Sequence, residues 1–229
     1  MVAVAGAGYG RGLFGEVATM LTVYGFSRIH AMAYGRTRDL RVLWALEEMG
    51  LPFVLMGLDY ANGELDAPAV RALNPFRQLP VIDDDGVVVS ESGAIVLYLA
   101  RKSGRLWAAD EAGRAQVSRW CFAALTTVEP PLVGLDLLEM SQVQELREEW
   151  SAMAERALSS LEDWLQGREF VATDAFTVAD ILMALVLSDL RDDAVFAPYP
   201  AVRAYRERCL ARPAWKTVCE AYRTWVKPD

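Results

Sequence analysis

Two short segments in the first half of the sequence carry residue types that could hold a small peptide. Pro80 begins an apolar run at 79–82, and a proline donates no hydrogen bond to a neighbouring strand. A cis Leu79–Pro80 bond, at a cost of about 0.5–1 kcal/mol, would turn the N–H and C=O groups of Leu79 outward. Those groups could pair with an extended peptide as an added strand. The alternative is an ordinary trans proline on an edge strand.

The second segment, at residues 90–93, opens a predicted helix. Free N–H groups and the positive end of the helix dipole favour a bound carboxylate there. The Ser92 hydroxyl would add a donor, and the Glu91 carboxylate could accept a hydrogen bond from an ammonium group. A helix cap without a ligand is the alternative. Together the two segments describe a site for the charged groups of one amino acid beside a backbone edge for the next.

The elements that must position these segments follow the order βαβ-α-ββ-α. A helical crossover between the first two strands makes them parallel, and Asp85-Gly86 between short apolar runs predicts a hairpin. The segment from Gly25 to Arg38 is polar and is expected to be irregular. This order describes a thioredoxin-like α/β domain. The predicted strands lie at 20–24, 53–58, 79–82 and 87–90, and the predicted helices at 39–49, 67–73 and 91–102.

The second half of the chain carries apolar residues at helical spacing throughout. Long helices are expected at 111–139 and 142–166, and shorter ones at 178–190, 201–210 and 214–225. The first residues are rich in Gly, Ala and Val and lack the pattern of a signal peptide. The predicted division is a flexible tail at 1–19, the thioredoxin-like domain at 20–102, a linker at 103–110 and an all-helical domain at 111–229.

The runs 74–82 and 90–99 are similar to the glutathione-binding half of cytosolic glutathione transferases. The segment 176–180 in the helical half resembles the capping box and hydrophobic staple of the same family. The resemblance covers about residues 20–225. It combines two separate segments and the domain order, so it supports the family more strongly than any one motif does.

The resemblance assigns roles to the residues of both segments. It implies that Leu79 and Pro80 hold the cysteinyl backbone of glutathione and that Glu91 and Ser92 hold its γ-glutamyl group. Gln78 would contact the glycine carboxylate. A metal is not expected in this site, and glutathione would be the co-substrate.

In the same family a hydroxyl or thiol after the first strand activates the glutathione sulfur. A donated hydrogen bond and a helix N-terminus lower a thiol pKa, each pKa unit corresponding to about 1.36 kcal/mol. Counting back from Arg41 favours Thr37, whereas counting forward from the strand favours Ser27. Tyr34, His30 and Tyr24 remain as alternatives. Arg36 could bind a glutathione carboxylate bidentately.

Composition excludes several other kinds of function. The net charge of −8 disfavours nucleic acid and anionic membrane surfaces, and no apolar run is long enough for a membrane helix. The sequence has three cysteines, at 121, 209 and 219, without a C-x-x-C motif, which argues against a disulfide framework or a zinc ribbon and fits the cytoplasm. The single histidine, His30, rules out a histidine-based metal cluster.

The resemblance therefore implies a detoxifying enzyme that stabilises the glutathione thiolate and conjugates it to a hydrophobic electrophile, as a homodimer. One alternative is a regulatory or structural member of the family that binds glutathione without transferase activity. A second alternative is a glutathione-dependent peroxidase or reductase. The sequence does not name the electrophile or the class within the family.

Overall fold

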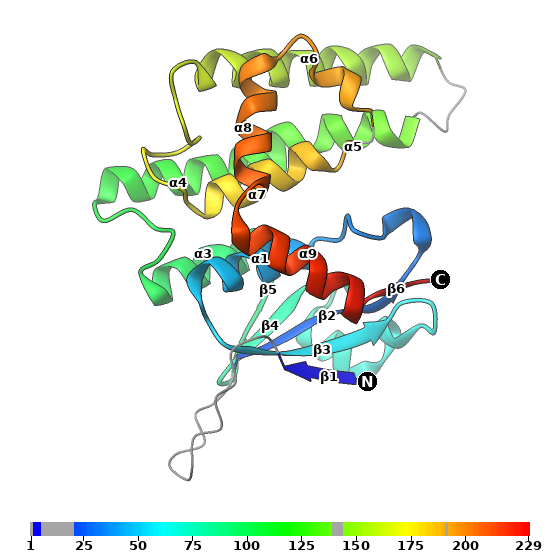
Figure 1. Cartoon of the computed structure of the whole chain (residues 1–229). Coiled ribbons are helices and arrows are strands. Elements are labelled where there is room, and N and C mark those ends of the chain that lie inside the picture. The colour runs from blue at the N-terminus through cyan, green and yellow to red at the C-terminus, as the bar shows by residue number, and fades with distance from the viewer. Residues whose placement is uncertain (1, 6–20, 139–143, 191) are drawn as a thin grey trace. The chain divides into compact units, whose positions relative to one another are not determined.

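The computed structural model describes residues 2–5, 21–138, 144–190 and 192–229. The chain divides into two compact units, of which the first joins Met1–Leu99 to Pro213–Asp229 and the second is Ala100–Arg212. Among the described residues, the first unit combines a sheet with helices and the second is helical (Figure 1).

The sheet of the first unit has the strand order β1-β3-β2-β4-β5, with β6 beside β2. Strands β2 and β3 are parallel and are joined by helix α1 (Asp39–Met49), whereas β4 and β5 form an antiparallel hairpin. Both pairings were predicted, and the thioredoxin-like order is confirmed. The strands are β1 (Val2–Ala5), β2 (Leu21–Ile29), β3 (Phe53–Asp59), β4 (Val81–Asp84), β5 (Val87–Ser90) and β6 (Lys227–Pro228).

Strand β2 is longer than predicted, because it continues through Gly25 to Ile29. Pairing with β3 extends past Gly25, and β6 pairs with Arg28 and Ile29, so partners distant in sequence keep this segment extended. The prediction of an irregular segment from Gly25 onward was therefore wrong for its first residues. Strand β1 pairs antiparallel with β3 where a flexible tail was expected. The rest of that expected tail, residues 6–20, lies outside the described residues.

The predicted all-helical domain was 111–229. The last helix, α9 (Pro213–Trp225), belongs instead to the sheet unit. It packs against α1, where the rings of Trp44 and Trp215 lie 4.9 Å apart. Trp225 makes an edge contact with Phe53 at 6.4 Å. Trp44 is fully buried, and burial of aromatic rings of this size contributes strongly to packing. The other helices of this unit are η1 (Ala31–Ala33), η2 (Glu64–Asp66), α2 (Pro68–Leu73) and most of α3 (Ser92–Ser103).

The helical unit contains the predicted long helices with one interruption. The helix expected at 111–139 has a π-helical turn at 124–128, just before Pro130 and Pro131. Prolines have no N–H to donate back to the preceding turn, so the regular hydrogen-bond ladder cannot continue there. The elements of this unit are α4 (Glu111–Ala123), η3 (Ala124–Val128), α5 (Glu129–Leu138), α6 (Gln144–Leu165), α7 (Val178–Ser188), η4 (Asp193–Phe196) and α8 (Pro200–Leu210).

Helix α7 is buried over residues 178–187, and the predicted capping box at its start is confirmed. The Asp180 carboxylate accepts hydrogen bonds from the backbone N–H groups of Thr177 and Val171, each at 2.8 Å. It also accepts from the hydroxyls of Thr177 at 3.0 Å and Tyr205 at 2.9 Å. This buried residue therefore organises the helical core and takes no part in the candidate site.

Within the part of the chain that the structure describes, no helix combines the length and the apolar character needed to cross a membrane.

Candidate functional site

The register of the β4–β5 hairpin brings the two predicted binding segments together. Val81 pairs with Ser90, so Leu79 and Pro80 precede the pair on one strand while Glu91 follows it on the other. The hairpin turn lies at the opposite end. Because antiparallel partners face each other directly, the Leu79–Pro80 edge and the start of α3 meet at one end of the sheet.

The backbone of Leu79 offers an open edge at this point. The Leu79–Pro80 bond is cis, one of the two alternatives that the sequence had left open. Leu79 is 7% exposed, and among the described residues its N–H and C=O groups have no hydrogen-bonding partner. The loop before it is held by buried Asn74, whose amide donates to the Gln78 carbonyl at 2.8 Å. Buried backbone groups require partners, and an extended peptide placed along this edge would supply them.

Glu91 and Ser92 lie where the hairpin passes into α3. Glu91 is exposed and has a left-handed backbone, with φ of +68°. Such a conformation costs a non-glycine residue about 1–3 kcal/mol and persists where the surrounding structure enforces it, often at binding sites. Ser92 is buried as the first residue of α3, whose first-turn N–H groups lack partners within the helix. A carboxylate and an ammonium group could both be bound here.

Arg41 joins this site from α1, although no role was predicted for it from the sequence. Its guanidinium donates to the Ser92 hydroxyl at 3.4 Å, and the residue is only 2% exposed. The available signal was a charged residue within the otherwise apolar stripe of Leu40, Leu43 and Trp44. A buried cation next to Ser92 adds positive potential to a site suited to carboxylates.

Thr37 lies just before α1, and its hydroxyl oxygen is 2.8 Å from the phenol oxygen of Tyr222 on α9. Thr37 is 9% exposed. The ring of Tyr34 lies 5.4 Å from that of Tyr222. Burial, followed by the nearby Asp39 carboxyl, raises the pKa of the Tyr222 phenol, which therefore stays protonated. Of the predicted activators, Thr37 and Tyr34 therefore both lie next to Tyr222, which was not among the residues predicted from the sequence.

Asp39 is buried beneath the same segment. One carboxyl oxygen accepts from the backbone N–H of Phe26 at 3.1 Å, and the other is buried without a hydrogen-bonding partner. Burial raises the pKa of Asp39, while the nearby Thr37 side chain and the Phe26 N–H act in the opposite direction. Gly25 permits this close approach, since a Cβ there would lie 2.9 Å from the Asp39 carboxyl oxygen. The start of α1 is thereby fastened to β2.

The other candidate activators lie in different surroundings. Ser27 belongs to β2, at the irregularity between Phe26 and Arg28, and its side chain lies against Gly57 of β3. His30 is exposed and caps η1, where its ring accepts from the backbone N–H of Met32 at 3.3 Å. The His30 side chain therefore has a structural role that is independent of any ligand.

Tyr24 and Arg36 complete the set of predicted residues. Tyr24 is half-buried and packs on an apolar cluster that contains Leu79. Arg36 is half-buried in the segment before Thr37. Within the described residues no group of three or more His, Cys, Asp or Glu side chains could hold a metal ion.

The helical unit contains a separate cavity of about 380 Å³ with mainly apolar walls. Trp120 contributes to it from α4 and Met153 from α6, and the Trp120 ring also packs on Trp164 at 5.0 Å. The remaining residues that line this cavity are Ala123, Thr127, Val128, Pro131, Arg156, Ala157, Ser160 and Leu161.

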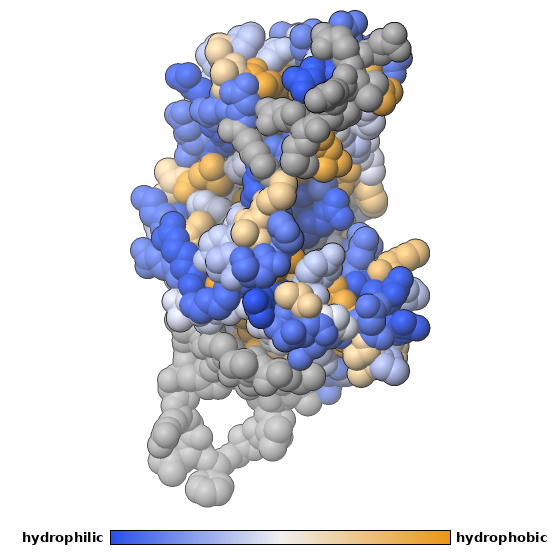
Figure 2. Space-filling model, turned by 90° about the vertical axis from the view of Figure 1, so that its right-hand side faces the viewer, coloured by the Kyte–Doolittle hydropathy of each residue, from blue (hydrophilic) through white to orange (hydrophobic). Residues whose placement is uncertain are grey.

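On the face drawn in Figure 2, the coloured apolar residues form small groups among hydrophilic ones.

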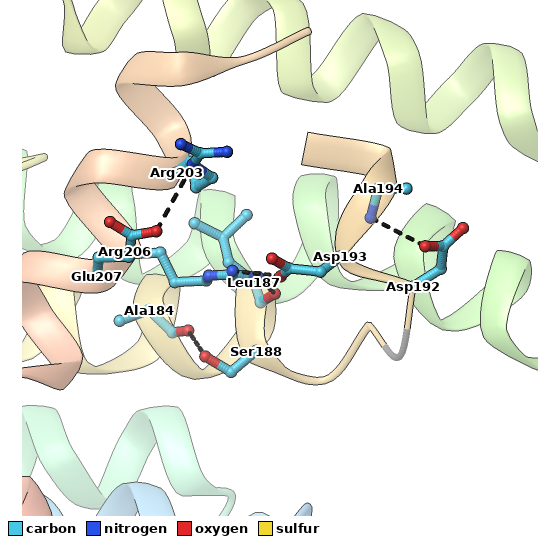
Figure 3. Close-up of polar contacts among 9 residues, drawn as sticks. All are labelled: Ala184, Leu187, Ser188, Asp192, Asp193, Ala194, Arg203, Arg206 and Glu207. Carbon is cyan, nitrogen blue, oxygen red and sulfur yellow. Dashed lines mark hydrogen bonds and ion pairs between the residues drawn. The ribbon is translucent and has the colours of Figure 1, made fainter. Parts of the chain in front are cut away.

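A second cavity of about 480 Å³ is lined by residues of α7, η4 and α8. Figure 3 shows the polar contacts of several of these residues. Arg206 lines this cavity and forms an ion pair with Asp193. Its guanidinium also donates to the Leu187 carbonyl at 3.5 Å and lies over the ring of Phe196. The Ser188 hydroxyl donates to the carbonyl of Ala184 in the preceding turn at 2.6 Å. These polar groups are satisfied by the protein itself, and the cluster stabilises the end of α7.

The fold and the hairpin end together define a class: a thioredoxin-like domain with an unpaired backbone edge beside the start of α3, followed by a helical domain. The family models for the N-terminal and C-terminal domains of glutathione S-transferase match residues 40–102 and 121–213, which together make up more than half of the chain. The chain therefore belongs to the glutathione S-transferase family.

Individual relatives are distant but cover most of the chain. Glutathione S-transferase 1 of Triticum aestivum is 29% identical over 212 residues, which are 83% of this chain and 93% of the relative. A glutathione transferase from Burkholderia graminis, solved with two glutathione molecules bound per subunit, has 26% identity and a TM-score of 0.76. The match covers 87% of this chain and 88% of that one. Glutathione transferase F7 of Populus trichocarpa has 25% identity and a TM-score of 0.75, over 89% of this chain and 99% of that one.

Proposed function

We propose that this protein is a glutathione transferase that binds glutathione at the end of the β4–β5 hairpin. It would stabilise the thiolate and conjugate it to hydrophobic electrophiles. The observation that carries the proposal is the unpaired backbone edge of Leu79 beside Glu91 and the start of α3. This arrangement fits a γ-glutamyl peptide, which presents a backbone to pair and an amino acid's two charges to bind. Distant relatives that are glutathione transferases support the same conclusion.

Each candidate residue takes a role that its position allows. The Leu79 N–H and C=O groups pair with the cysteinyl residue, while Glu91 accepts from the γ-glutamyl ammonium. Ser92 and the first-turn N–H groups of α3 bind the γ-glutamyl carboxylate. Gln78, which is exposed beside Leu79, and Arg36 are assigned to the glycine carboxylate.

Thr37 is the proposed thiol activator. It precedes α1, whose N-terminus favours negative charge, and Arg41 on the same helix reaches Ser92. Ser27 is the weaker candidate because its side chain lies against Gly57 within the sheet. In the proposed reaction the thiol proton passes to solvent, and the thiolate forms a carbon–sulfur bond with the electrophile. A halide or other leaving group departs in substitution, whereas a proton is taken up at the neighbouring carbon in addition.

The test is calorimetry with glutathione, combined with the ultraviolet absorbance of the bound thiolate across pH. We expect wild-type protein to lower the thiol pKa of bound glutathione. The Thr37→Val variant should return that pKa toward its free value by about 1–2 units, at about 1.36 kcal/mol for each unit. The Ser27→Ala variant is the matched control and should behave as wild type. Absence of binding at millimolar glutathione would contradict the proposal, and an effect of Ser27→Ala alone would reassign the activator.

The family likeness also supports a homodimer with a role in detoxification in the cytoplasm. Light scattering of the purified protein measures its oligomeric state. A mass equal to one chain at micromolar concentration would contradict the proposed homodimer.

A further inference from the structure

The C-terminal segment is fastened to the region around Thr37 by contacts that begin at the end of β2. Strand β6 pairs with Arg28 and Ile29. The Asp229 side chain accepts from the backbone N–H of Ala31 at 2.8 Å, and the Asp229 N–H donates to the Ile29 carbonyl at 3.1 Å. These contacts place α9 so that Tyr222 reaches Thr37 across 185 positions of sequence.

The Tyr222 phenol lies next to two hydrogen-bonding groups, the Gly35 backbone and the Thr37 hydroxyl. Its oxygen accepts from the backbone N–H of Gly35, so its O–H remains to be donated. A phenol is far more acidic than an alkyl hydroxyl and is the better donor of the two. The Tyr222 and Thr37 oxygens lie 2.8 Å apart, and either one can donate. Donation by Tyr222 leaves the Thr37 proton for a second acceptor, for which a bound thiol would compete with the nearby Asp39 carboxyl.

From this geometry we propose that Tyr222 is a positioning residue, which acts through Thr37 to direct its hydroxyl proton at the glutathione sulfur. This inference rests on the proposed function of Thr37. A hydroxyl that accepts one hydrogen bond becomes a stronger donor in the next, because the two bonds polarise each other. The sheet unit would therefore contain an incomplete thiol site without its C-terminal helix.

The packing around Tyr222 allows its hydroxyl to be tested separately from its ring. The ring contacts Tyr34, and α9 is held independently by Trp215 against Trp44 and by Trp225 against Phe53. Tyr222→Phe keeps the ring and should leave α9 in place. It removes the phenol O–H, and with it the contact to Thr37 and the hydrogen bond from the Gly35 N–H.

The experiment compares Tyr222→Phe with wild type in glutathione conjugation and in thiolate absorbance across pH. We expect kcat to fall about tenfold and the bound thiol pKa to rise, because the hydrogen bond that positions Thr37 is lost. The KM for glutathione should change by less than about twofold, since binding depends on Leu79, Glu91 and Ser92. Tyr98→Phe is the matched control. It removes a phenol bond of 2.6 Å to Asp84 in the same unit and should leave both kcat and the thiol pKa unchanged.

A double-mutant cycle separates action through Thr37 from a general structural effect. In a Thr37→Val background, Tyr222→Phe should have no further effect on kcat or on the thiol pKa. Equal losses in both backgrounds would show that Tyr222 acts independently of Thr37 and would overturn the inference. A Tyr222→Phe variant with a lower thiol pKa or a higher kcat would also overturn it, because Tyr222 would then be withholding the Thr37 proton.

The two proposals fail in different ways. A wild-type protein that binds no glutathione, or binds it without lowering its thiol pKa, removes the proposed function and this inference together. A wild-type protein that lowers the thiol pKa, with Tyr222→Phe indistinguishable from it, overturns the role of Tyr222 alone.

Discussion

Glu91 holds a backbone conformation that its side chain disfavours, with φ of +68° in an exposed position. Replacing it with glycine should raise the free energy of unfolding by about 0.5–1 kcal/mol, because glycine adopts this conformation without steric cost. The same change removes the proposed carboxylate for the glutathione ammonium. The Kd for glutathione should therefore rise about tenfold or more, measured by calorimetry beside urea unfolding.

Asp85 provides the matched control for Glu91. It lies in the turn at the other end of the same hairpin, is exposed and has φ of +55°. Asp85→Gly should give a similar gain in stability and leave the Kd for glutathione unchanged. Glutathione binding by Glu91→Gly that equals wild type would show that the left-handed residue has no part in the site.

Helix α7 depends on Asp180, which accepts hydrogen bonds from two backbone N–H groups and two hydroxyls in the core of the helical unit. Asp180→Ala would leave these donors buried without partners. We expect the free energy of unfolding to fall by about 3 kcal/mol or more, measured by urea denaturation.

An exposed helix cap gives the comparison for Asp180. Asp110 is the N-cap residue of α4, and its side chain accepts from the backbone N–H of Gly113 at 2.7 Å. Because this position is exposed, water can replace the hydrogen bond when the side chain is removed. Asp110→Ala should cost only about 1 kcal/mol. Equal costs for the two variants would mean that the buried network contributes no more than an ordinary cap.

On the scale of the whole molecule, the reactivity of the three cysteines can be used to follow the opening of each unit separately. Cys121 and Cys209 are buried in the helical unit, whereas Cys219 is half-buried on α9 of the sheet unit. Burial raises the pKa of all three thiols, that of Cys209 to about 12, and Cys219 is the least buried of the three. Thiolate is the reactive form, so an alkylating reagent should modify Cys219 first and the other two only on unfolding.

Mass spectrometry of native protein at mildly alkaline pH checks the cysteine prediction. The Cys219→Ser variant should acquire almost no label until denaturant is added. Labelling of Cys121 or Cys209 as fast as Cys219 in native protein would show that the helical unit opens far more readily than its packing implies.

Much of the candidate site was predictable because its signals are local. Asp85-Gly86 specifies the hairpin, and the hairpin register alone places Leu79 and Glu91 at the same end. The capping box at Thr177 and Asp180 lies within one helical turn and was found for the same reason. The π-helical turn before Pro130 and Pro131 was missed, although those prolines are a local signal for it.

Other features depended on pairing between distant parts of the chain. Strand β2 continues past Gly25 because β3 and β6 bind its edges, and neither partner is adjacent in sequence. The periodicity of α9 indicated a helix without indicating that it would pack on α1. Ser27 and Thr37 had therefore been placed in one loop, whereas Ser27 belongs to the strand.

By itself the sequence determined the order of elements, the hairpin end that gathers Gln78, Leu79, Glu91 and Ser92, and the buried cap of α7. These follow from spacing within a few residues, where turn chemistry and helix geometry act directly. Only the tertiary structure decided that α9 completes the sheet unit and that Tyr222 meets Thr37 across 185 positions. Such a contact depends on how β6 and two tryptophans position a helix, and no local pattern encodes that packing.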